Sequence, residues 1–155
     1  MRNINSLKPL IEKQLAAPAG EVSIIDLVDL IVEYAFSSRA SDIHVEPAEN
    51  NVVVRLRIDG ILQDALTFAK DIQDEVVSRI KVLSGLKTDV HHIPQDGRFK
   101  AKIEGAEEID IRVSIVPTYY GENVVMRILA ETSQMLTLED LGFTKEQLGL
   151  IEKAI

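Results

Sequence analysis

The chain has 155 residues, of which 46% are hydrophobic, so it can bury one sizeable core and should fold without metals or disulfides. It has no cysteine, which excludes a disulfide framework, a cysteine-zinc site and a thiol nucleophile. Its net charge of −8 argues against nucleic-acid binding through the phosphate backbone. The N-terminus lacks the apolar core of a signal peptide, and no run approaches the roughly 20 apolar residues that span a bilayer, so we expect a soluble, unexported chain.

Two helices are predicted at the start of the chain. Residues 6–15 follow a short helical period and precede the linker AAPAGE, so we expect residues 1–22 to form a loosely attached arm. Ser23 and Asp26 form a capping pattern at the start of SIIDLVDLIVEYAFSS, in which apolar residues recur at the helical spacing. This second stretch is therefore predicted to be a helix.

A hairpin and a third helix are predicted next. Residues 52–66 alternate apolar and polar side chains on both sides of Asp59 and Gly60, a dipeptide that accepts the positive φ angles of a tight turn. The helical period returns over residues 71–84, and Gly85 supplies a C-terminal cap.

The second half of the chain is predicted to be a meander followed by helix. Three β-rich runs over residues 98–129 are separated by EG and by PTYYGE, which predicts three strands. Residues 130–155 return to a helical pattern through LEDLGF, and Thr144 with Gln147 forms a second capping pair. The elements together predict an α+β fold, a mainly antiparallel sheet of about six strands with helices packed on one side.

The stretch SDIHVEP places Asp42, His44 and Glu46 at alternate positions of a predicted strand, so the three side chains would share one face. Spacing alone leaves two interpretations open. The row is either the polar face of a strand or a site for zinc, iron or manganese, as in a metal hydrolase. A weaker metal candidate is His91-His92 with Asp96 nearby, for which a solvent-exposed loop is the alternative.

The predicted strands place basic residues on the face opposite the core. Counting outward positions gives seven basic residues against three acidic ones, a surplus of +4 in a chain of −8. The basic positions are Arg55, Arg57, Arg98, Lys100, Lys102, Arg112 and Arg127, and the acidic ones are Asp59, Glu104 and Asp110. Because the planar guanidinium suits carboxylate or phosphate groups, this pattern favours an anionic partner, and ordinary cross-strand ion pairs are the alternative.

Six motifs resemble, in order and spacing, the N-terminal half of the type II secretion and type IV pilus assembly ATPases. They are SDIHVEP, RLRIDGIL, RIKVLSGL, IPQDGRF, IDIRVSIVPTYYGENVVMRIL and LEDLGF, and they span roughly residues 23–150. The resemblance implies that residues 23–130 form a PAS-like (N2-type) domain, preceded by an arm over residues 1–22. It also implies that residues 131–155 are a linker and the start of a RecA-like ATPase domain.

The resemblance implies a non-catalytic role for this chain. No G-x-x-x-x-G-K-[ST] phosphate-binding loop occurs in it, so we expect a fragment that is not itself an ATPase and holds no cofactor. ATP and magnesium are implied for the full-length protein. The implied partners are RecA-like ATPase domains of its own and neighbouring subunits in a hexamer and inner-membrane platform proteins, without nucleic acid. The implied location is the cytoplasm, peripheral at the inner-membrane face.

The resemblance also implies roles for particular residues. Arg98, Arg112 and Arg127 are implied to reach the nucleotide of a neighbouring subunit, where a guanidinium stabilises the charge that develops on the γ-phosphate. The alternative for each arginine is a structural salt bridge to one of three carboxylates, Asp110, Asp59 or Glu122. SDIHVEP is a strand in the family, which favours its structural interpretation. For the whole chain, the alternative function is a stand-alone PAS-like module that binds a small ligand in its core.

Overall fold

The computed structural model describes residues 4–103, 108–129 and 142–152, and these ranges contain four α-helices and six strands. The helices are α1 (Ile4–Leu15), α2 (Ile24–Ser37), α3 (Gln73–Leu83) and α4 (Lys145–Glu152), with 3-10 turns at Ala19–Glu21 and Lys70–Ile72. The strands are β1 (Ala40–Pro47), β2 (Asn51–Ile58), β3 (Ile61–Ala69), β4 (Gln95–Ala101), β5 (Ile109–Thr118) and β6 (Gly121–Leu129).

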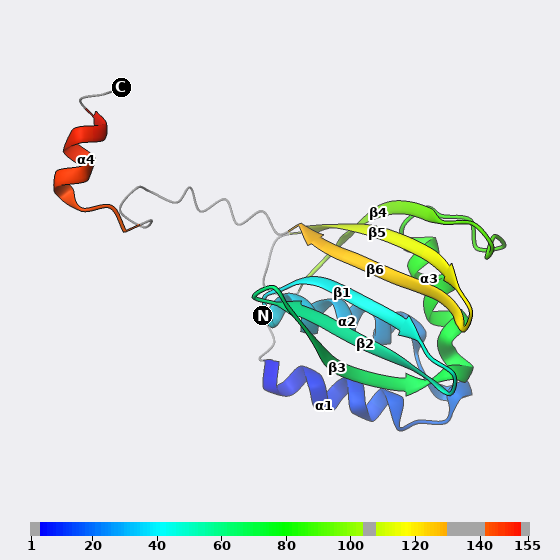
Figure 1. Ribbon diagram of the computed structural model, residues 1–155. Helices are drawn as coiled ribbons and strands as arrows, with labels where there is room; N and C mark the ends of the chain where they lie inside the picture. Colours follow the sequence, from blue (N-terminus) through cyan, green and yellow to red (C-terminus); the bar gives the residue numbers. More distant parts are fainter. Residues whose placement is uncertain (1–3, 104–107, 130–141, 153–155) are drawn as a thin grey trace.

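The six strands form one antiparallel sheet in the order β3-β2-β1-β6-β5-β4. Two meanders, β1 to β3 and β4 to β6, meet at the centre, where the first and last strands pair and Ile43 lies opposite Met126 (Figure 1). The predicted α+β fold with six antiparallel strands is confirmed. The central pairing decides which outward side chains become neighbours, because directly opposed residues share a face.

Helices cover one face of the sheet. Figure 1 shows α2 and α3 behind the strands, and α2 packs against β1 and α3 against β4. The strand residues that face these helices are apolar and buried, as Val45 on β1, Val54 on β2 and Ile111 on β5 illustrate. No helix within residues 4–103 and 108–129 covers the opposite face, so the predicted one-sided arrangement is confirmed.

Helix α1 belongs to the core. Leu7 and Ile11, one helical turn apart, are both 0% exposed and join the buried cluster of α2 and the sheet. The Gln14 side chain also accepts a hydrogen bond from the backbone N–H of Ser23 at 3.4 Å. The expectation of a loosely attached arm is therefore wrong for α1, because the apolar side of α1 packs against α2.

The predicted turns and caps form as local chemistry dictates. Ser23 accepts a hydrogen bond from the N–H of Asp26 at 3.4 Å at the start of α2. Asp59 and Gly60 have φ angles of 50° and 81° in the β2–β3 turn, and Gly85 follows α3 with a φ of 67°.

The predicted cap at the start of the last helix, α4, is also confirmed. The backbone N–H of Thr144 donates to the side chain of Gln147 at 2.9 Å, and the Gln147 N–H donates to the Thr144 hydroxyl at 3.4 Å, which is a capping box at the start of α4. The Glu104-Gly105 connection and most of LEDLGF fall within residues 104–107 and 130–141, outside the described ranges.

The edge strand β4 is fixed closely against the end of α3. A Cβ at Gly97 would lie 2.7 Å from the Ser84 carbonyl oxygen, so only glycine permits this approach. The Gln95 side chain binds both the backbone N–H and the carbonyl of Lys87 at 3.0 Å. The PQDGRF segment is therefore tied to the loop after α3, which fixes where Arg98 leaves the sheet.

Candidate functional site

One line of charged side chains crosses the open face of the sheet. Arg98 on β4 opposes Arg112 on β5, which opposes Arg127 on β6. Arg127 in turn opposes Asp42 on β1, which opposes Arg57 on β2. We call these five residues the arginine row. The three arginines that the resemblance singled out are therefore direct neighbours on adjacent strands.

Asp42 lies within this row and binds two of its arginines. Its Oδ1 accepts a hydrogen bond from Arg127 Nε at 3.0 Å, and its Oδ2 lies 3.5 Å from Arg57 Nε. The Ser41 hydroxyl donates to the same Oδ2 at 2.8 Å. The Asp42 side chain is only 7% exposed, whereas that of Arg127 is 65% exposed. Both oxygens of this buried carboxylate thus have partners.

The surroundings of Asp42 favour its ionised form. Burial alone would raise the pKa of this carboxyl, but hydrogen bonds from Arg127 and Ser41 and the positive charges of Arg127 and Arg57 outweigh it. The pKa of Asp42 is consequently lower than usual. The carboxylate is charged at neutral pH and forms a fixed negative point inside the row.

Arg98 and Arg112 differ from the other arginines of the row. Both side chains are exposed, and neither has an ion-pair or hydrogen-bond partner in the part of the chain that the structure describes. Like charges directly opposite one another on neighbouring strands are unfavourable without a counter-ion. Two adjacent guanidinium groups of this kind can bind a phosphate or carboxylate through charge-assisted hydrogen bonds.

The surplus of positive charge lies in the row, and the open face as a whole is nearly balanced. Within the described strands, six basic side chains share this face with five acidic ones. The basic ones are Arg55, Arg57, Arg98, Lys100, Arg112 and Arg127, and the acidic ones are Asp42, Glu46, Asp64, Asp96 and Asp110. The predicted surplus of +4 is wrong, because β1, β3 and β4 add carboxylates to the face and Lys102 follows the end of β4.

The residues proposed as a metal site lie on one strand face as predicted, but arginines bind their carboxylates. Arg55 donates to Glu46 at 2.9 Å and to Asp64 at 2.7 Å, and His44 Nδ1 lies 3.6 Å from Glu46. Asp42 is bound within the arginine row. Within residues 4–103, 108–129 and 142–152, no three His, Asp or Glu side chains are placed to hold a metal ion.

The Glu122 side chain does not lie on the open face of the sheet. Its carboxylate lies 2.9 Å from Lys81 Nζ and 2.8 Å from His91 Nδ1, on the side of the sheet that carries α3. The salt bridge considered between Glu122 and an arginine is therefore wrong. His91, a weak metal candidate from the sequence, is a partner of this carboxylate. The contact was missed because Glu122 and Lys81 are 41 residues apart and no local pattern links them.

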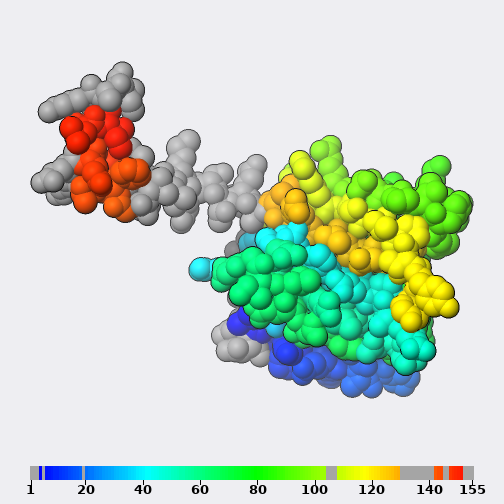
Figure 2. All heavy atoms as spheres, viewed as in Figure 1, coloured from blue at the N-terminus to red at the C-terminus, as the bar shows by residue number. Residues whose placement is uncertain are grey.

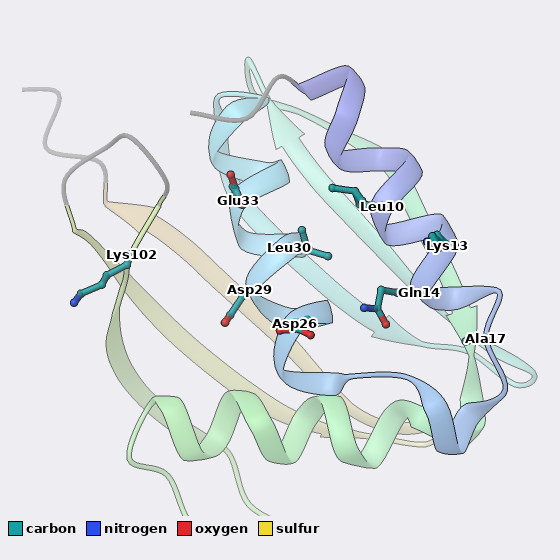
Figure 3. A pocket seen from close by; sticks show the side chains of 9 residues that line it. All are labelled: Leu10, Lys13, Gln14, Ala17, Asp26, Asp29, Leu30, Glu33 and Lys102. Carbon is teal, nitrogen blue, oxygen red and sulfur yellow. The ribbon is translucent and has the colours of Figure 1, made fainter.

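Apart from the arginine row, a concave region lies between α1 and α2, with a volume of about 650 Å³. Figure 3 shows its lining: Asp26, Asp29 and Glu33 come from α2, Lys13 and Gln14 from α1, and Lys102 from the segment after β4. Burial and the neighbouring Asp26 raise the pKa of Asp29, and the positive charge of a nearby arginine, Arg79, opposes this only in part. The groove is acidic along α2 and holds no counterpart of the arginine row.

In the described ranges, no helix combines the length and apolar character that crossing a membrane requires.

The structure is thus an antiparallel sheet that is packed with helices on one face and carries the arginine row on the other. Comparison with known proteins gives the family: the chain belongs to the type II/IV secretion system protein family, whose model matches residues 17–155. This confirms the resemblance found in the six motifs.

Three relatives illustrate the match. A type IV pilus assembly ATPase of Myxococcus xanthus is 39% identical over 142 residues, which is 92% of this chain and 25% of the relative. A type II secretion system protein E of Xanthomonas campestris is 40% identical, over 88% of this chain and 24% of its own length. The type II secretion system protein HxcR of Pseudomonas aeruginosa is 39% identical over 100% of this chain and 32% of its own length. The chain thus spans about a quarter to a third of these relatives.

Proposed function

We propose that this chain is a non-catalytic N-terminal domain of a secretion or pilus assembly ATPase. In this proposal residues 23–130 form the PAS-like domain, residues 1–22 precede it and add α1 to its core, and residues 131–155 lead into a RecA-like ATPase domain. Family membership and the ATPase named among the relatives support this assignment. The domain packs on the ATPase domains of its own and neighbouring subunits of a hexamer.

The arginine row carries the proposal. Arg98, Arg112 and Arg127 occupy adjacent strands on a face that no helix of residues 4–103 and 108–129 covers, so a second surface can reach all three. Figure 2 shows this side of the molecule as a broad surface made by the strands. Placed against a neighbour's nucleotide, the guanidinium groups stabilise the charge that develops on the γ-phosphate during transfer.

The full-length protein, in this proposal, binds ATP and magnesium in its ATPase domain, while the present chain holds neither. It works in the cytoplasm at the inner-membrane face, where platform proteins of the secretion or pilus machine are its further partners. The alternative of a small-ligand-binding module draws no support from the core. Glu122, a polar strand residue on the helical side, is already bound to Lys81.

The test compares two measurements on the same substitutions. In the full-length protein, Arg98→Ala and Arg112→Ala should each lower ATP turnover by on the order of 10- to 1000-fold. In the present chain both should leave the free energy of unfolding within about 1 kcal/mol, since neither arginine has a partner in the described residues. Arg127→Ala should lower turnover least of the three, because Asp42 already binds its guanidinium, and should destabilise by about 1 to 3 kcal/mol because it leaves Asp42 without its nearest charged partner.

Arg55→Ala is the matched control. It removes an exposed arginine from the same sheet face, but one that binds Glu46 and Asp64 outside the row. Turnover should stay near that of the unmodified protein. If all three row variants hydrolyse ATP normally, the proposed role is wrong. If Arg98→Ala and Arg112→Ala unfold the domain, their loss of turnover reports folding instead of phosphate contact.

A further inference from the structure

We propose that Asp42 is a positioning residue that divides the arginine row, holding Arg127 and Arg57 and leaving Arg98 and Arg112 as the pair that binds a phosphate group. The inference rests on the proposed function for the identity of the anion. It gives SDIHVEP a role that is neither metal binding nor strand formation alone.

The division follows from how the Asp42 carboxylate is used. Oδ1 is bound by Arg127 Nε at 3.0 Å, and Oδ2 is shared between the Ser41 hydroxyl at 2.8 Å and Arg57 Nε at 3.5 Å. The side chain is 7% exposed, so water competes weakly for these bonds. A phosphate that approaches Arg127 or Arg57 must therefore either displace a buried carboxylate or accept its repulsion.

The other half of the row has the opposite character. Arg98 and Arg112 face each other across β4 and β5, and neighbouring strands lie about 4.8 Å apart, so both guanidinium groups can reach one phosphate. The strand that carries Arg98 is held by Gly97 packed on Ser84 and by the Gln95 contacts, so its backbone is already in place. No carboxylate of the described residues is bound to either arginine.

Neutralising Asp42 should extend the phosphate site along the row. Asp42→Asn keeps the size of the side chain and removes the charge that holds Arg127 and Arg57. The released Arg127 guanidinium can then turn toward an anion bound at its neighbour Arg112, whereas Arg57 stays bound to the Gly60 carbonyl at 3.0 Å. We expect phosphate affinity to rise on the order of threefold to tenfold, the effect of gaining one or two exposed charge contacts.

The test titrates inorganic triphosphate into this chain at low salt and follows the Nε–H signals of its arginines by NMR. In the unmodified chain, Arg98 and Arg112 should shift together along one binding curve, while Arg127 and Arg57 shift much less. In Asp42→Asn, Arg127 should shift together with Arg98 and Arg112 along one curve with the tighter affinity. A residue that only stabilised the fold would leave the anion affinity and the set of shifting arginines unchanged.

Asp64→Asn is the matched control, because it makes the same change beside Arg55, outside the row. It should leave the titration of the row unaltered. The proposal is overturned if Arg127 shifts as much as Arg98 in the unmodified chain, if no arginine responds to triphosphate, or if Asp42→Asn leaves the affinity unchanged. Should Asp42→Asn fail to fold, the unmodified chain still decides the question. The titration needs no ATPase domain, so its result is independent of whether full-length variants lose turnover.

Discussion

Lys81 has no exposed surface, although its ammonium group is strongly hydrated in water. Its Nζ lies 2.9 Å from Glu122 and donates to the carbonyl of Val90 at 2.7 Å. The Gln95 side chain binds the same carbonyl at 2.9 Å. One buried ion pair therefore connects the end of α3, the loop that follows it and the start of β6, which are the segments that support the arginine strands.

Glu122→Leu should destabilise the chain by about 3 to 5 kcal/mol, because it leaves the Lys81 ammonium buried without its counter-ion. Replacing both partners, Lys81→Met with Glu122→Leu, should restore most of that loss, since no uncompensated charge then remains. The free energy of unfolding in urea measures both. Equal losses in the single and double variants would show that shape, not charge, decides this site.

At the scale of elements, α2 carries two different surfaces. Its apolar side packs on β1, while Asp26, Asp29 and Glu33 line the groove toward α1 (Figure 3). Burial raises the pKa of Asp29, and the negative charge of Asp26 adds to this, while the positive charge of Arg79 opposes it only in part. Asp42 on β1 shows the opposite behaviour, because arginines surround it.

These opposite shifts predict opposite dependences of stability on pH. A raised pKa means that ionising Asp29 costs stability, so its contribution is present at low pH and is lost as the pH rises through its folded pKa. The lowered pKa of Asp42 stabilises the fold above the usual pKa of 3.8, and this is lost as the pH falls through the folded value. Replacing the aspartate by asparagine should therefore change the free energy of unfolding in opposite directions at the two positions.

Asp29→Asn should be more stable than the unmodified chain at pH 7 by a few tenths of a kcal/mol, a small value because the side chain is 62% exposed. Asp42→Asn should be less stable at pH 7. Both differences should shrink as the pH falls, for Asp29→Asn because the raised pKa lets its carboxyl gain a proton first, and for Asp42→Asn because the unfolded chain takes up the proton before the folded one. Urea midpoints at the two pH values report this, and a loss of stability in Asp29→Asn at pH 7 would mean that its contact with Arg79 outweighs burial.

The elements that local chemistry specifies could be predicted from the sequence. The cap at Ser23, the Asp59-Gly60 turn and the strand alternation of SDIHVEP each depend on neighbouring residues only. The pairing of β1 with β6 depends on distant residues, and without it Asp42 could not be recognised as the partner of Arg127. The arginines were therefore predicted by resemblance, while the carboxylate that organises them was not.

At the scale of the whole molecule, charge is distributed unevenly. The chain carries −8, yet the arginine row contains four guanidinium groups and one carboxylate. The row lies on the open face, and the acidic groove lies between helices. Such an arrangement favours contact of a phosphate group with the row over contact with the acidic groove. The proposed trans contact therefore needs the sheet, not the helices, to meet the neighbouring subunit.

Mixed oligomers of the full-length protein test this trans contact most directly. One subunit carries Arg112→Ala with an intact nucleotide site, and the other keeps its arginines but has an ATPase domain that cannot bind nucleotide. Each alone should be nearly inactive. If arginines act on the neighbour's nucleotide, mixing them should restore ATP turnover, because intact arginines then face intact sites. Turnover that stays at the level of the separate variants at every mixing ratio, in oligomers shown to contain both subunits, would contradict the trans role.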